Sequence, residues 1–166
     1  MLINLHAKKL IFLILFSSLL MSDDRFKNTN NVPNLKSFGD FLKWSFNRKR
    51  PAPIKIESSD EWKKFVDLKE NYLIWIGHST FLINVDGTVV LTDPVFSERA
   101  SPVKIAGPKR IIPPAMQIQD LPEIDVVTVS HNHYDHLDIP SLKKLATKNP
   151  KTLFLVPKGD QKLLNR

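Results

Sequence analysis

A mixed α/β (α+β) fold is predicted by three features of the sequence. Short apolar runs rich in β-branched residues, bounded by Gly, Pro and Asp, are typical of strands; they occur at 73–76, 81–85, 88–92, 124–130 and 152–156. Apolar residues at three- and four-residue spacing predict helices between or before these runs, as at 35–46. A separate hydrophobic segment at 10–21 stands near the N-terminus and is predicted to be a leader outside this fold.

Composition narrows the class of protein. The chain has 166 residues, of which 42% are hydrophobic and 25% charged, as in ordinary globular proteins, and its length suits one domain with an extension. It has no cysteine, so any metal must be held by His, Asp or Glu. The net charge is +7, but no basic stripe interleaved with aromatic residues is present, and we therefore exclude a nucleic-acid partner.

The N-terminal region is expected to direct the chain to a membrane. Residues 1–22 carry two lysines before a twelve-residue apolar run, which is too short to span a bilayer comfortably and fits a signal peptide or a membrane anchor. The expected localisation is membrane-associated or exported. The alternative is a buried hydrophobic segment of a cytoplasmic protein.

Residues 23–70 are expected to form a linker and a helical extension. The helix at 35–46 has an aromatic face and is followed by the basic run Arg48-Lys49-Arg50. Two interpretations stay open: the face lies on an anionic membrane surface, or it packs on the protein core beside a solvated basic loop. A second helix is predicted from Ser59 or Asp60 through Glu70.

Residues 71–166 are expected to form the main domain. Its first three strands make an antiparallel meander, with Asp86-Gly87 as a tight turn, and a proline-rich ordered loop follows at 95–114. The strand at 124–130 then precedes a helix at 141–148 that Asp138 caps, with Pro140 in its first turn. A strand at 152–156 and a last helix near Asp160 complete the chain.

The most informative stretch is His131-Asn132-His133-Tyr134-Asp135-His136, directly after a predicted buried strand. Imidazole and carboxylate ligands at this density suit zinc. His131 and His133 are two residues apart and can share one ion. Asp135 and His136 can reach a second ion, and two ions about 3.5–4 Å apart can clamp a phosphoryl or carbonyl group. Alternatively, Asp135 orients one of the imidazoles.

Four other residues are candidates for supporting roles. Asp93 either ends its strand in a turn or fixes the tautomer of a cluster imidazole. His78, in a Gly-flanked bend, is more typical of a structural histidine than of a ligand. Lys109 and Arg110 could hold a phosphate group or lie in a solvated turn.

The chain resembles the metallo-β-lactamase-fold hydrolases, and within them the branch of N-acyl-phosphatidylethanolamine-hydrolysing phospholipase D and its bacterial relatives. The match runs from about Tyr72 to Val156. The motifs that carry it are Trp75-Ile76-Gly77-His78-Ser79-Thr80-Phe81-Leu82, Leu91-Thr92-Asp93-Pro94-Val95-Phe96-Ser97, Gly107-Pro108-Lys109-Arg110 and Ser130-His131-Asn132-His133-Tyr134-Asp135-His136-Leu137-Asp138.

This resemblance implies an αββα sandwich with two zinc ions at one edge of its sheets. It implies that His131 and His133 bind one zinc and that Asp135 and His136 bind the other. A hydroxide bridging the ions would attack the phosphorus of a phosphodiester, as in a phospholipid, and Asp135 would act as the catalytic residue that positions the hydroxide or moves its proton. The partners implied are a phospholipid or other phosphodiester and a membrane surface.

The sequence departs from the family pattern in one respect. The family supplies a histidine, a bridging aspartate and a final histidine later in its chains, whereas no histidine follows His136 here. We therefore expect only the first half of the αββα sandwich, with an open apolar sheet face, a partial metal site and no hydrolase activity from this chain alone unless a complementing C-terminal half is supplied. The alternatives are an inactive membrane-associated remnant and a metallo-hydrolase of another ester or lactone.

Overall fold

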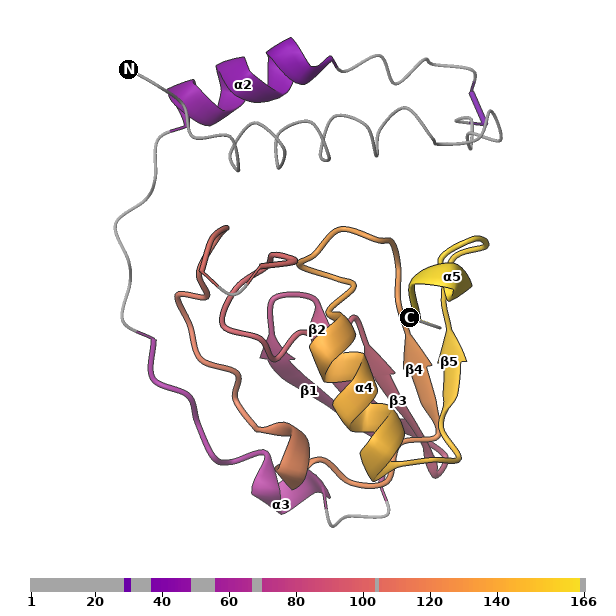
Figure 1. Cartoon of the computed structure of the whole chain (residues 1–166). Coiled ribbons are helices and arrows are strands. Elements are labelled where there is room, and N and C mark those ends of the chain that lie inside the picture. Colours follow the sequence, from indigo (N-terminus) through magenta and orange to yellow (C-terminus); the bar gives the residue numbers. More distant parts are fainter. Residues whose placement is uncertain (1–28, 31–36, 49–55, 67–69, 104, 165–166) are drawn as a thin grey trace. The chain divides into compact units, whose positions relative to one another are not determined.

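A computed structural model describes residues 29–30, 37–48, 56–66, 70–103 and 105–164 (Figure 1). The chain divides into two compact units, Met1–Pro51 and Ala52–Arg166. The predicted leader at 1–22 lies outside the described residues, as does much of the predicted linker. Within the part of the chain that the structure describes, no helix is both long and apolar enough to cross a membrane.

In the first unit, the predicted amphipathic helix is present as α2, Phe38–Asn47. It begins at a capping box, in which the Ser37 hydroxyl accepts from the Asp40 N–H at 3.2 Å and the Asp40 carboxylate accepts from the Ser37 N–H at 2.8 Å. None of its ten residues is buried. The aromatic rings follow one another along the helix, with centroids 6.1 Å apart for Phe38 and Phe41 and 6.0 Å for Phe41 and Trp44.

The second unit is built on a five-stranded sheet in the order β1-β2-β3-β4-β5. The predicted meander is confirmed as β1 (Tyr72–Gly77), β2 (Thr80–Val85) and β3 (Thr88–Thr92), with antiparallel pairing. Asp86 and Gly87 have φ of 49° and 83°, the left-handed conformation of a two-residue hairpin turn. Glycine is suited to this φ because it has no Cβ.

The remaining strands are parallel to β3. The structure has β4 at Val126–Thr128 and β5 at Leu153–Leu155, each shorter than the predicted run. Helix α4 (Ile139–Lys148) connects them and lies across one face of the sheet (Figure 1). A short 3-10 turn, η1 (Ile118–Asp120), precedes β4, and α5 (Gln161–Leu164) follows β5 near the predicted Asp160.

The predicted helix from Ser59 or Asp60 through Glu70 is shorter than expected. Among the described residues of this segment, the structure has the helical turn α3, Lys63–Val66, while residues 67–69 lie outside the described part of the chain. Glu70 lies in a bend before β1 rather than in a helix. Its carbonyl accepts a hydrogen bond from the Asn84 side chain at 3.0 Å, so the backbone here is tied to the sheet.

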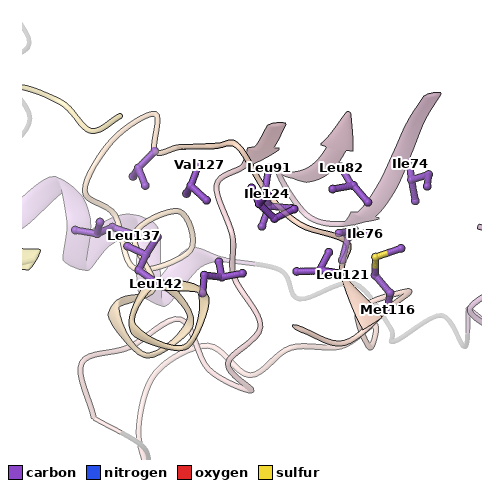
Figure 2. Packing of buried hydrophobic residues seen from close by; sticks show 12 residues of the cluster. Ile74, Ile76, Leu82, Leu91, Met116, Leu121, Ile124, Val127, Leu137 and Leu142 are labelled. Carbon is purple, nitrogen blue, oxygen red and sulfur yellow. The ribbon is translucent and has the colours of Figure 1, made fainter. Parts of the chain in front are cut away.

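The hydrophobic core lies between α4 and one face of the sheet (Figure 2). Leu82, Leu91 and Val127 come from three adjacent strands, and each has no exposed surface. Leu145 of α4 packs into the same cluster and is also completely buried. Since burying one such side chain contributes about 1.5–3 kcal/mol, this layer fixes the sheet and with it the loops at the strand ends.

The opposite face of the sheet is apolar and open in the described part of the second unit. Leu73 and Trp75 on β1 are 66% and 50% exposed, and Leu153 and Leu155 on β5 are 56% and 49% exposed. The register joins these edges through the paired residues Leu73–Ile83, Ile83–Val90, Val90–Val126 and Val126–Leu153. An open apolar face is what the sequence predicted for the first half of a sandwich.

Candidate metal centre

Strand direction gathers the candidate residues at one rim of the sheet. Because β1 and β3 both run antiparallel to β2, and β4 is parallel to β3, the carboxyl ends of β1, β3 and β4 lie at the same edge. His78 follows β1, Asp93 follows β3, and the histidine-rich loop 131–136 follows β4. Residues from three distant parts of the sequence therefore meet there.

The loop itself folds back after its first two histidines. The Val129 N–H donates to the Leu155 carbonyl at 2.9 Å, which keeps the chain in the sheet up to Ser130. The N–H groups of His136 and Leu137 then both donate to the His133 carbonyl, at 3.0 and 2.7 Å. This turn brings the end of the loop back toward its beginning.

His131 and His133 face each other at the start of the loop. Their Nε2 and Nδ1 atoms are 3.0 Å apart, and their ring centroids are 4.6 Å apart. Burial, together with the neighbouring rings of His136 and His133, lowers the pKa of His131 below its usual value. A neutral imidazole is the form that binds a metal. The two ring nitrogens lie close enough to bind one ion, and the shared ion stays a prediction.

Asp93 holds His136 and the first residue of the loop. One of its oxygens lies 2.8 Å from His136 Nδ1 and accepts from the Ser130 hydroxyl at 2.8 Å, and the other accepts from the Ser130 N–H at 2.6 Å. Burial acts to raise the pKa of Asp93, but the hydrogen bonds from His136 and Ser130 outweigh it and keep that pKa low. Asp93 thus lies directly after β3 and also holds the His136 imidazole.

Asp135 lies between two histidines. Its Oδ2 atom is 3.2 Å from His78 Nε2 and 3.8 Å from His136 Nε2. One ligand atom from each of these three residues lies within 4.8 Å of the other two. His78 keeps 49% of its side chain exposed, so it faces this group of ligand atoms and solvent rather than the core.

The two basic candidates lie in the long loop after Asp93. Arg110 donates hydrogen bonds from its guanidinium to the carbonyls of Val95 and Ser97. Burial lowers the pKa of Arg110, although the charge of Asp138 acts to raise it. Lys109 is exposed, and its backbone bridges to Arg99. Arg110 therefore supports the loop, and among the described contacts neither side chain touches the histidines.

The predicted cap of α4 works differently from the expectation. Asp138 stands at the N-cap, but its side chain makes no capping bond to the helix backbone. Instead, its buried carboxylate accepts from the N–H groups of Phe96 and Ser97 and from the hydroxyls of Ser97 and Ser141. Asp138, two residues after His136, thus ties the loop that follows Asp93 to the start of α4.

Two further contacts of the loop were not anticipated. Ser130 bridges Asp93 and the cluster, since its hydroxyl is also 2.9 Å from His131 Nδ1. The Asn132 amide donates to Asp160 at 3.0 Å, and Asp160 is 9% exposed. Ser130 directly precedes the histidine motif in the sequence, which is a signal for the first contact, whereas nothing near Asp160 points to the second.

The donor set fits a divalent metal ion. With Nδ1 of His136 bonded to the Asp93 carboxylate, Nε2 is the atom left to act as a ligand. Imidazole nitrogens and a carboxylate oxygen at one rim match the ligands that zinc and similar ions prefer. His131, His133, Asp135 and His136 stay predicted ligands, and the structure brings all four together.

Comparisons with known proteins agree with this architecture. The family model described as "Beta-lactamase superfamily domain" matches residues 72–164. A Caenorhabditis elegans protein named N-acyl-phosphatidylethanolamine-hydrolyzing phospholipase D 1 is 45% identical over 91 residues, covering 55% of this chain and 26% of its own length. A mitochondrial protein of Saccharomyces cerevisiae with the same enzyme name is 43% identical over 114 residues, or 64% of this chain and 24% of its own.

A third relative carries a more general description. A protein of Hyperthermus butylicus described as a metal-dependent hydrolase is 36% identical over 66 residues, covering 40% of this chain and 24% of its own length. This chain thus spans about a quarter of the length of the relatives that it matches. The chain belongs to the metallo-β-lactamase-fold superfamily of metal-dependent hydrolases and is a homologue of N-acyl-phosphatidylethanolamine-hydrolysing phospholipase D.

Proposed function

We propose that this chain provides the first half of the active site of a zinc-dependent phosphodiesterase that acts on a phospholipid. The observation that carries the proposal is the placement of both predicted ligand pairs at one rim, with His131 Nε2 and His133 Nδ1 3.0 Å apart and Asp135 Oδ2 and His136 Nε2 3.8 Å apart. The substrate class is suggested by the names of the relatives from worm and yeast.

Each residue of the rim has a proposed role. His131 and His133 hold one ion, while Asp135 and His136 hold the other, with His136 oriented by Asp93. When bound, two such ions supply an activated hydroxide nucleophile and neutralise charge on the phosphoryl group. Asp135 would also position the hydroxide or accept its proton, since its side chain is 46% exposed and its Oδ2 atom faces both imidazoles.

Full activity is proposed to need more ligands than these. A catalytic zinc keeps about three protein ligands and a water, and the four predicted ligands give each ion only two. The open apolar face across β1 to β5 is the surface that a second sheet covers in a two-layer sandwich. A complementing segment that brings the missing ligands would cover this face as well, and without it we expect no hydrolysis.

The proposal is tested with a chimera. Residues 72–164 replace the matching segment of the worm relative, which is 45% identical, and release of phosphatidic acid from N-acyl-phosphatidylethanolamine is measured with added zinc. We expect activity within about tenfold of the parent, because the rim geometry is retained, and its loss in the same chimera with Asp135→Asn. A folded, zinc-loaded chimera without activity refutes the proposal, and activity on lactones alone would favour that other reaction.

We also propose that the chain associates with a membrane surface. Helix α2 supports this, because Phe38, Trp44 and Phe46 are 64%, 57% and 85% exposed. The basic run Arg48-Lys49-Arg50 follows it in the sequence. Aromatic side chains next to positive charge suit an anionic bilayer surface. Co-sedimentation of the full chain with vesicles that contain phosphatidylglycerol, but not with pure phosphatidylcholine, is the expected result.

A further inference from the structure

We infer that His78 is a third protein ligand beside Asp135 and His136, so that the chain alone carries one three-ligand metal site. The inference deepens the proposed function, because it rests on the metal site proposed at this rim. It changes the expected ligand count of one ion from two to three. Three protein ligands plus water is the set that catalytic zinc sites commonly use.

The distances between the three ligand atoms support a shared ion. Ligand atoms about 2.0–2.1 Å from a tetrahedral zinc lie roughly 3.3 Å from one another. His78 Nε2 and Asp135 Oδ2 are 3.2 Å apart, and His136 Nε2 and Asp135 Oδ2 are 3.8 Å apart. One ligand atom from each of the three residues lies within 4.8 Å of the other two, so small side-chain rotations are enough to bring the residues around one ion.

The orientation of each side chain is also set by its neighbours. Asp93 holds Nδ1 of His136, which leaves Nε2 for the ion. The His78 ring meets the His136 ring edge to face, with centroids 5.2 Å apart. Asp135 presents the same oxygen, Oδ2, to both histidines. Two imidazole nitrogens therefore converge on one carboxylate oxygen.

The backbone holds His78 in an uncommon conformation. Its φ is 52°, in the left-handed region that few residues other than glycine adopt. The Trp75 indole N–H donates to the His78 carbonyl at 2.9 Å, and the strand register shifts between Trp75 and Gly77. Strained backbone of this kind is concentrated at functional sites. Here it places His78 at the rim where the β4 loop ends.

Coordination of an ion by His78 is distinguished from a hydrogen bond to Asp135 by a probe that detects the bond between metal and ligand itself. The chain has no cysteine, so the variant His78→Cys places its only thiol at this position. On coordination the thiol loses its proton to the buffer and the sulfur binds the ion as a thiolate. With cobalt(II) as the probe, a sulfur ligand gives a thiolate-to-cobalt charge-transfer band in the near ultraviolet.

The full 166-residue chain is titrated with cobalt(II) under reducing conditions, and folding of each variant is checked by circular dichroism. We expect the band in His78→Cys and not in the matched control Ser79→Cys, which places a thiol one residue away. We expect His78→Asn to bind cobalt at least about tenfold more weakly than the wild type, since even the outer partners of ligands contribute about 10–100-fold. His78→Gln, whose longer amide side chain extends its N–H donors farther toward Asp135, should not restore the affinity.

The outcomes separate this inference from the proposed function. Wild-type chain that takes up no cobalt overturns the metal site and the role of His78 together. Wild-type chain that binds cobalt, with His78→Cys binding it equally but showing no charge-transfer band, overturns His78 as a ligand and leaves the other ligands standing. A band of equal intensity in Ser79→Cys, or full affinity in His78→Gln, would also overturn it.

Discussion

Replacing Asp93 with asparagine keeps the shape of the side chain but turns one oxygen into an amide NH2 group. In the wild type, three donors converge on the two oxygens: the Ser130 N–H at 2.6 Å, the Ser130 hydroxyl at 2.8 Å and His136 Nδ1 at 2.8 Å. Asparagine has only one acceptor oxygen. Its NH2 group must therefore face either the Ser130 N–H or His136 Nδ1, and both orientations are unfavourable.

The expected size of the effect follows from these contacts. If the NH2 group faces His136, the imidazole must move its proton to Nε2, the atom that would bind the ion. Loss of such a carboxylate partner costs about 10–100-fold in metal affinity, or about 1.4–2.7 kcal/mol. Each lost hydrogen bond to a charged acceptor is worth about 1.5–3 kcal/mol, so the free energy of unfolding should fall by a similar amount.

The assay is a zinc titration in competition with a chromophoric chelator, with urea unfolding of the metal-free chain measured in parallel. Asp86→Asn is the matched control, because Asp86 is an exposed residue of the β2–β3 turn and asparagine accepts its positive φ. The control should bind zinc as the wild type does. Wild-type zinc affinity in a correctly folded Asp93→Asn chain would refute the claim that Asp93 orients His136.

Four other perturbations have defined outcomes. Asp138→Ala removes the carboxylate that accepts four hydrogen bonds and should lower the free energy of unfolding by about 3–5 kcal/mol. A loss below about 1 kcal/mol in urea titration would contradict the proposal that Asp138 anchors the loop after Asp93. Gly107 has a φ of 93°, and an added Cβ would lie 2.6 Å from the Ser101 Cβ. Gly107→Ala should therefore destabilise the loop by about 1–3 kcal/mol and make its proteolysis faster. An unchanged rate of cleavage in the loop would contradict this prediction. Because folding lowers the pKa of Asp93, its contribution to stability is present above about pH 4 and is lost as the pH falls through the folded pKa. Urea titrations from pH 7 to 3 should show an acid-induced loss of the free energy of unfolding in the wild type that Asp93→Asn lacks. Phe46→Ser, at a side chain 85% exposed, should leave unfolding unchanged and weaken sedimentation with anionic vesicles severalfold, and unchanged sedimentation would argue against α2 as the membrane contact.

Local patterns in the sequence were enough to predict the strands and the histidine loop. The alternate positions of Phe81, Ile83 and Val85 and the Asp86-Gly87 turn predict the hairpin between β2 and β3, because both signals depend only on neighbouring residues. The spacing of His131 and His133 likewise predicts a shared ion from local geometry. Where the local signal was weaker, as in the helix expected through Glu70, the described residues contain the helical turn α3, and Glu70 lies in a bend.

The supporting residues depend on contacts between distant segments. Asp93 and His136 are 43 residues apart in sequence, and Asp138 and Phe96 are 42 apart. Both pairs meet because β3 and β4 are parallel neighbours in the sheet. No pattern of neighbouring residues in the sequence predicts that pairing. For this reason the sequence left the two interpretations of Asp93 equally open and presented Asp138 as a helix cap.

The sequence by itself determined that strands, turns and a dense set of imidazole and carboxylate ligands follow one another in this order, since those signals are carried by residues a few positions apart. Only the tertiary structure decided that His78 and Asp93 join the same rim. The reason is physical: parallel and antiparallel pairing sets which strand ends share an edge, and burial of one sheet face under α4 holds that edge in place.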